Sequence, residues 1–199
     1  MRVLFVCGGT GGHINPALAV AGHLKEKDPE VKILFAGSPL GMEANLVPKA
    51  GYDFAPVKVK GFQRQLSWNN IKNNLMALVY LTTSGARSRQ IIKEFQPDVV
   101  MGTGGYASFP ALFVGSKMGI PTCVHEANAM PGLTTRMAAS WASRVLICFE
   151  ESARHYKKPE KCTAVGMPVR KDFFLTEKAA ARAELGIGEE PLIVSTFGS

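Results

Sequence analysis

Short apolar runs recur along most of the chain and alternate with segments of helical pattern. In order, the runs read VLFVC, VKILFAG, FAPVKVK, PDVVMGTG, PTCVHEAN, SRVLICF and CTAVGMP. They are largely apolar rather than alternating, so both faces of each strand are expected to be covered. Buried strands that alternate with helices predict an α/β chain with a doubly wound parallel sheet.

The chain changes character after the sequence GMPVRKDFF. TEKAAARAELGIG has the composition of a helix, and PLIVSTFGS has the pattern of a further apolar strand. We therefore expect one domain over residues 1–165, and a linker with the first helix and strand of a second domain over residues 166–199. A lone terminal strand has nothing to pair with, so we interpret the sequence as a truncated chain.

The composition is that of a globular protein, with 46% hydrophobic and 20% charged residues among 199. No stretch reaches the roughly 18 apolar residues of a membrane span and no signal peptide is evident, so a cytosolic protein is the default. The formal charge is +7, and cations gather between Asp53 and Glu94, where no acid occurs. Such a segment favours phosphates, nucleic acid or an acidic membrane surface as a partner, or else is a solvated face.

The motif GGTGGH follows the first apolar run. Its glycines let the backbone turn tightly and let N–H groups approach an anion, and a helix expected to begin near Asn15 adds its positive end. The motif therefore predicts a diphosphate-binding loop, with a ligand-free tight turn as the alternative. It is neither a dinucleotide fingerprint nor a P-loop, because the later glycine and a Gly-Lys-Ser/Thr sequence are absent.

Two further polar clusters follow strands, GTGGYASFP at residues 102–110 and HEANAMPG at residues 125–132. His125 and Glu126 are adjacent and point opposite ways in an extended chain, so one of them, with Asn128, is expected to face a cleft. The chain has no D-x-D pair, no zinc-type His/Cys spacing and no G-x-S-x-G elbow. These absences favour neither a metal site nor an acyl-transfer hydrolase.

Six segments taken together resemble one bacterial family. They are GGTGGHINPALAVA, GMEANLVPKAGY, MGTGGYASFPA, HEANAMPGLTTR, VGMPVR and TFGS, in this order along the whole chain. The family comprises the inverting glycosyltransferases that transfer N-acetylglucosamine from UDP-GlcNAc to muramoyl-pentapeptide-diphospho-undecaprenol in peptidoglycan synthesis. The resemblance implies the N-terminal, Rossmann-like, acceptor-binding domain of a two-domain GT-B enzyme that uses no metal or other cofactor. Because most of the UDP-sugar pocket belongs to the other domain, this chain alone is expected to be inactive.

The resemblance also implies roles for individual residues. Contact with the donor is expected from Thr10, Gly11, Gly12, Asn128, Arg170 and Ser199. Contact with the acceptor is expected from Gly8, Gly9, Gly104, Gly105, Tyr106 and His125. Imidazole titrates near neutral pH, so we hypothesise that His13 is the general base that accepts the proton of the acceptor hydroxyl, with Glu126 as runner-up. The ending STFGS departs from a more glycine-rich form common in such proteins.

The basic segment has apolar residues on one helical face, flanked by cations, which suits peripheral contact with an anionic leaflet. The membrane-contact residues are expected to be Trp68, Ile71, Lys72, Leu75, Val79, Arg87 and Arg89. The apolar stripe is alternatively core. A nucleic-acid partner is not expected, because no reading motif occurs. The resemblance implies a location at the cytoplasmic face of the inner membrane, with proteins of cell-wall synthesis and division as further partners.

Two other functions stay open. One is a different UDP-sugar enzyme of the same fold, such as an epimerase, which a product assay with the lipid acceptor would separate. The other is a non-catalytic, membrane-associated scaffold domain, whose partner binding would survive loss of His13 and Glu126.

Overall fold

The computed structural model describes residues 1–59 and 83–191. It divides the chain into two compact units, Met1–Val169 and Arg170–Ser199. The first unit holds the sheet and all three polar clusters. That residues 166–199 open a second domain stays a prediction.

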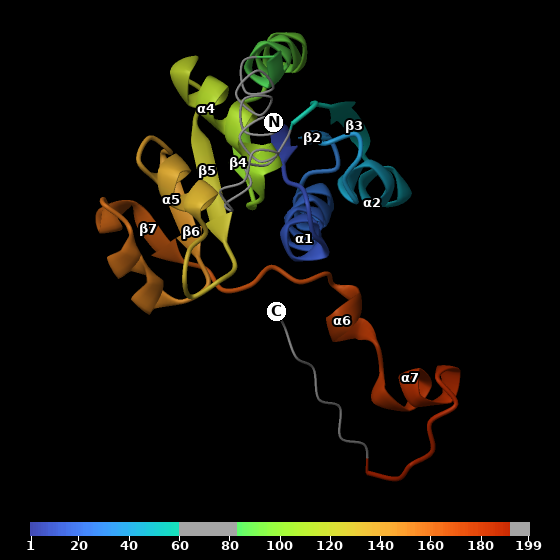
Figure 1. The fold of residues 1–199 in the computed structure, drawn as a ribbon. Coiled ribbons are helices and arrows are strands. Elements are labelled where there is room, and N and C mark those ends of the chain that lie inside the picture. Colours follow the sequence, from blue (N-terminus) through green and yellow to red (C-terminus); the bar gives the residue numbers. More distant parts are fainter. Residues whose placement is uncertain (60–82, 192–199) are drawn as a thin grey trace, which may run out of the picture. The chain divides into compact units, whose positions relative to one another are not determined.

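The first unit is built on a seven-stranded sheet with the order β3-β2-β1-β4-β5-β6-β7, in which every pairing is parallel (Figure 1). The strands are β1 Arg2–Val6, β2 Lys32–Gly37, β3 Asp53–Pro56, β4 Val99–Gly102, β5 Thr122–Glu126, β6 Arg144–Ile147 and β7 Cys162–Ala164. Each overlaps one of the apolar runs, so the predicted doubly wound parallel sheet is confirmed.

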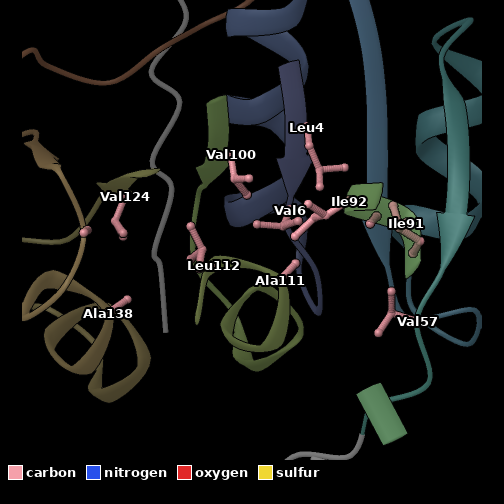
Figure 2. Packing of buried hydrophobic residues seen from close by; sticks show 12 residues of the cluster. Leu4, Val6, Val57, Ile91, Ile92, Val100, Ala111, Leu112, Val124 and Ala138 are labelled. Atoms are coloured by element: carbon pink, nitrogen blue, oxygen red, sulfur yellow. The ribbon is translucent and has the colours of Figure 1, made fainter. Parts of the chain in front are cut away.

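Helices cover both faces of the sheet. Alternate residues of a strand therefore pack into two different hydrophobic clusters, one on each face. Val3 and Phe5 pack with Ile14 and Ala17 of α1, whereas Leu4 packs in a second cluster with residues of α4, α5 and the helical segment 83–95 (Figure 2). Besides the segment 83–95, the described helices of this unit are α1 Gly11–Lys27, α2 Glu43–Lys49, α4 Phe109–Lys117 and α5 Leu133–Ala139. Short 3₁₀ turns are η1 Tyr106–Ser108, η2 Glu150–His155 and η3 Pro159–Lys161.

Helix α1 begins at Gly11, four residues before the predicted start near Asn15, which is a correction. Thr10 is the N-cap residue, and its carbonyl accepts hydrogen bonds from the N–H groups of His13 and Ile14 at 3.1 and 3.2 Å. Pro16 therefore lies inside the helix rather than in its first turn. Since proline has no N–H, the carbonyl of Gly12 loses its usual helical partner. Half of the GGTGGH motif is thus helix rather than loop.

The chain reverses its winding direction between β1 and β4, which are neighbours in the sheet although distant in sequence. Thr103, directly after β4, donates its N–H to the carbonyl of Val6 at 3.2 Å and its hydroxyl to the carbonyl of His13 at 2.6 Å. The first and second glycine motifs therefore meet at the topological switch point, where open α/β sheets bind their ligands.

The second unit contains two short helices, α6 Asp172–Leu175 and α7 Lys178–Glu184. Helix α7 confirms the helix predicted in TEKAAARAELGIG. The guanidinium of Arg182 closes its end by donating to the carbonyls of Gly188 at 2.9 Å and Glu190 at 2.6 Å. The predicted strand over PLIVSTFGS lies outside the described residues beyond its first position.

Candidate functional site

His13 lies between the two glycine loops, in the first turn of α1. Its Nδ1 is 3.2 Å from the carbonyl oxygen of Gly8 and 3.3 Å from Oγ1 of Thr10. A carbonyl can only accept, so the bond to Gly8 requires the hydrogen on Nδ1. The lone pair of the neutral ring is then on Nε2, which is the nitrogen available to take a proton.

The second loop can approach His13 closely only because two of its residues, Gly104 and Gly105, have no side chain. Gly104 and Gly105 have φ angles of +107° and +78°, in the region that L side chains rarely adopt. A Cβ on Gly104 would collide with the imidazole of His13, and one on Gly105 would overlap the carbonyl of Gly8. Tyr106 follows at the start of η1 and keeps 45% of its surface exposed at the edge of the site.

Three of the six residues expected to contact the donor lie at the start of α1: Thr10 is its N-cap, and Gly11 and Gly12 are its first residues. Thr10 and Gly12 are exposed, and the Thr10 side chain makes no capping hydrogen bond. The first N–H groups of a helix have no acceptor within the helix, and they carry the positive end of its dipole. The amides of Gly11 and Gly12 are therefore placed as donors toward an anion.

Glu43, which the sequence reasoning did not single out, lies beneath the first loop. Its carboxylate accepts the N–H of Gly9 at 3.2 Å and that of Ser38 at 2.8 Å. Burial and then the Glu43 charge raise the pKa of the neighbouring Cys7 to about 12. The segment GSPLGMEANLV does contain a signal for this residue, because an acid follows two nearby glycines at the start of a helix. The same local sequence is also compatible with an exposed glutamate in the first turn of a helix, so it does not identify a buried one.

The third cluster has a different organisation from the one expected. Glu126 is 4% exposed, and its oxygens accept the backbone and side-chain N–H groups of Asn128 at 3.0 and 2.8 Å and the N–H of Gly132 at 3.0 Å. A carboxylate that accepts these three hydrogen bonds stabilises the conformation of its loop. This structural role argues against Glu126 as the alternative general base. Asn128 itself is exposed, with its amide group oriented by Glu126.

His125 is fully buried, so its side chain lines no open surface in this structure. Its Nε2 is 3.2 Å from the carbonyl of Gly166 and 3.6 Å from the Cys148 sulfur, and its Nδ1 has no hydrogen-bond partner in the described part of the chain. Burial lowers the pKa of His125, against the opposing effects of the Gly166 bond and the Glu126 charge. The side chains of His125 and Glu126 are therefore both buried, whereas the sequence predicted that one of them would face a cleft.

The remaining predicted contacts are Arg170, Arg87 and Arg89, together with six residues outside the described ranges. Arg170 belongs to the second unit, where its guanidinium carbon lies 5.7 Å from the ring centre of Phe173. Arg89 is exposed, and Nε of the half-buried Arg87 donates to the carbonyl of Pro56 at 3.4 Å. The predicted contacts outside the described residues are Ser199, Trp68, Ile71, Lys72, Leu75 and Val79.

Within residues 1–59 and 83–191, no three His, Cys, Asp or Glu side chains are grouped so that they could hold a metal ion. In the same ranges, none of the helices is both long and apolar enough to cross a bilayer.

The sheet order and the two glycine loops at its switch point define a Rossmann-like α/β domain. The comparisons with known proteins agree: residues 3–147 match the glycosyltransferase family 28 N-terminal domain. The chain belongs to this family.

Curated relatives and solved structures support this assignment. Two relatives are UDP-N-acetylglucosamine--N-acetylmuramyl-(pentapeptide) pyrophosphoryl-undecaprenol N-acetylglucosamine transferases. That of Acetivibrio thermocellus is 41% identical, over 100% of this chain and 53% of its own length. That of Ruminiclostridium cellulolyticum is 42% identical, over 100% of this chain and 54% of its own length. The chain therefore spans about half the length of these relatives.

Among solved structures, Acinetobacter baumannii MurG is similar with a TM-score of 0.69 and 25% identity, over 85% of this chain and 46% of that chain. The UDP-GlcNAc 2-epimerase of Neisseria meningitidis has a TM-score of 0.60 at 14% identity, over 84% of this chain and 46% of that chain, which shows the shared fold alone.

Proposed function

We propose that this chain is the acceptor-binding half of an enzyme that transfers N-acetylglucosamine from UDP-GlcNAc, with inversion, to muramoyl-pentapeptide-diphospho-undecaprenol. The observation that carries the proposal is the imidazole of His13, held between two glycine loops with its Nε2 lone pair available. Curated relatives whose names state this reaction align with the whole chain. The other half of the enzyme would supply most of the donor pocket, so turnover needs the intact protein.

In the proposed reaction, the acceptor hydroxyl attacks the anomeric carbon of the donor sugar from the side opposite UDP. The new C–O bond forms as the bond to the diphosphate breaks, and UDP leaves with that electron pair. Nε2 of His13 takes the hydroxyl proton. A positioned base of this kind contributes roughly 10²–10⁴-fold to the rate.

Negative charge on diphosphates would be met by the start of α1 rather than by a metal ion. The amides of Gly11 and Gly12 and the dipole of a 17-residue helix supply fixed positive potential there. Transfer by the intact enzyme is therefore expected to continue in excess EDTA. Activity that EDTA abolishes and Mg²⁺ restores would contradict this part of the proposal.

The decisive experiment compares His13→Ala with His23→Ala in the intact enzyme. His23 is exposed on the same helix and serves as the matched control. With labelled UDP-GlcNAc and a short-chain lipid acceptor, we expect kcat to fall at least about 100-fold for His13→Ala and to stay unchanged for His23→Ala. Near-normal turnover by His13→Ala would remove His13 as the base. Epimerised UDP-sugar formed without acceptor would replace the transferase by an epimerase.

We further propose that the enzyme works at the cytoplasmic face of the inner membrane, docked on anionic lipid. Arg89 and Lys117 are exposed cations, and Phe113, beside Lys117, leaves 39% of its surface exposed. Flotation should show more binding to vesicles with phosphatidylglycerol than to phosphatidylcholine vesicles, and less binding in high salt. Equal binding to both vesicle types, or to neither, would refute electrostatic docking.

A further inference from the structure

The carboxylate of Glu43 is fully buried at the start of α2 and joins two loops. Oε2 accepts the N–H of Gly9, in the loop after β1, and Oε1 accepts the N–H of Ser38, in the loop after β2. A carboxylate without water is costly unless it is hydrogen-bonded, so these two bonds explain how it can stay there.

The space that Glu43 occupies is made by three glycines from both loops. A Cβ added at Gly8, Gly37 or Gly41 would overlap the Glu43 side chain in each case. The fold therefore provides a specific space for the carboxylate next to the first loop, and Glu43 is not a surface side chain that happens to adopt this conformer.

The bond to Gly9 connects Glu43 with His13 through a single peptide group. The N–H of Gly9 and the carbonyl of Gly8 belong to one planar trans peptide, whose two polar ends point in opposite directions. Glu43 accepts at the N–H end, at 3.2 Å, and the Nδ1–H of His13 donates at the carbonyl end, also at 3.2 Å. Carboxylate, peptide and imidazole thus form one hydrogen-bonded chain.

We propose that Glu43 is a positioning residue that holds His13 in its Nδ1–H tautomer through the Gly8–Gly9 peptide. A negative charge at the N–H end polarises the peptide and makes the Gly8 carbonyl a stronger acceptor for Nδ1–H. The same bond fixes the orientation of the peptide, and with it that of the ring. That the exposed lone pair on Nε2 acts as a base rests on the proposed function; the link between Glu43 and the tautomer does not.

The test uses the intact enzyme labelled with ¹⁵N-histidine, in the variants Glu43→Gln, Glu43→Asp and Glu30→Gln. Glu30 is an exposed acid near the far end of α1, so Glu30→Gln removes the same charge away from the site. Long-range ¹H–¹⁵N spectra report which ring nitrogen carries the hydrogen, and His13→Ala identifies the signals of His13. Turnover and KM for UDP-GlcNAc are measured on the same samples.

We expect the Nδ1–H form of His13 in the unmodified enzyme and in Glu30→Gln. In Glu43→Gln the signals should move toward the Nε2–H form, kcat should fall about tenfold or more, and KM should change less than about twofold. Glu43→Asp keeps the charge but shortens the reach, so it should lie between the two. A variant that only loosens the fold would lower the amount of folded enzyme without changing the tautomer.

An Nε2–H tautomer in the unmodified enzyme would overturn the proposal even if Glu43→Gln failed to fold. An unchanged His13 tautomer in folded Glu43→Gln would overturn it as well. If Glu43→Gln changes the tautomer while His13→Ala keeps normal turnover, the proposed base fails and the positioning by Glu43 stands. The two proposals can therefore be refuted separately.

Discussion

Replacing Gly104 by alanine tests whether the second glycine loop exists to accommodate His13. Gly104 is buried with φ +107°, and an added Cβ would lie 2.5 Å from Cδ2 and 3.0 Å from Nε2 of His13. Carbon atoms in contact are normally about 3.5–4.0 Å apart, so the ring would have to move by roughly 1 Å or more. That movement would break the bond from Nδ1 to the carbonyl of Gly8.

The free energy cost has two parts, which a control variant separates. Gly51 has a similar φ of +82°, but a Cβ there would meet nothing within 4 Å. Gly51→Ala should therefore cost only the backbone strain, about 1–2 kcal/mol. Gly104→Ala should cost the same strain plus about 1–2 kcal/mol for overpacking and a lost hydrogen bond, or about 2–4 kcal/mol in total.

The assay is urea unfolding of both variants at neutral pH, followed by turnover measurements on the folded intact enzyme. We expect Gly104→Ala to unfold at lower urea than Gly51→Ala and to lose about 100-fold or more in kcat, because the base is displaced. Gly51→Ala should keep the original kcat. Equal unfolding midpoints together with equal turnover would show that the Gly104 contact with His13 has no consequence.

Two further predictions follow from pKa shifts. Burial raises the pKa of all four cysteine thiols, most strongly for Cys7, to about 12, and for Cys123, to about 11. At pH 8 these two should therefore react with iodoacetamide more slowly than Cys148 and Cys162, measured by peptide mass spectrometry, and faster labelling of Cys7 would contradict its burial. Burial lowers the pKa of His125 below the usual 6.5, so the folded state binds this proton less readily than the unfolded state. The unfolding free energy should therefore fall as pH decreases from about 7 to 5, and less steeply in His125→Asn; an equal slope in the variant would refute this cause.

The architecture could be predicted from the sequence because the strands are buried on both faces. Phe5 and Phe35 illustrate this: both are fully buried, their rings stack with centroids 5.0 Å apart, and neither strand alternates in polarity. The start of α1 could not be predicted in the same way. Asn15 and Pro16 are ordinary start signals, but the helix begins earlier, with the Thr10 carbonyl accepting from the N–H groups of His13 and Ile14. The hydroxyl of Thr103 donates to the carbonyl of His13 in this earlier turn, and only the fold brings those two residues together.

The site was predictable as a set of loops but not as a set of contacts. The glycine motifs do follow strands, as expected, and the fold brings both to the switch point with His13 between them. The local argument for His125 and Glu126 assumed that one neighbour faces a cleft, whereas the third cluster folds back and buries both. Glu43 was missed because its partners, Gly9 and Ser38, are 34 and 5 residues away, and no spacing rule connects them.

The buried carboxylate also changes what the first glycine loop can do with an anion. The N–H of Gly9 donates to Glu43, so it is not free to bind a phosphate, and a negative charge lies directly beneath it. An anion at this loop would take its hydrogen bonds from Gly11 and Gly12, whose amides belong to the first turn of α1 because the helix begins four residues before the predicted start near Asn15. Glycine is therefore needed for different physical reasons in the two pairs. Gly8 and Gly9 permit the close approach of a carboxylate below, while Gly11 and Gly12 leave the positive end of the helix uncovered above.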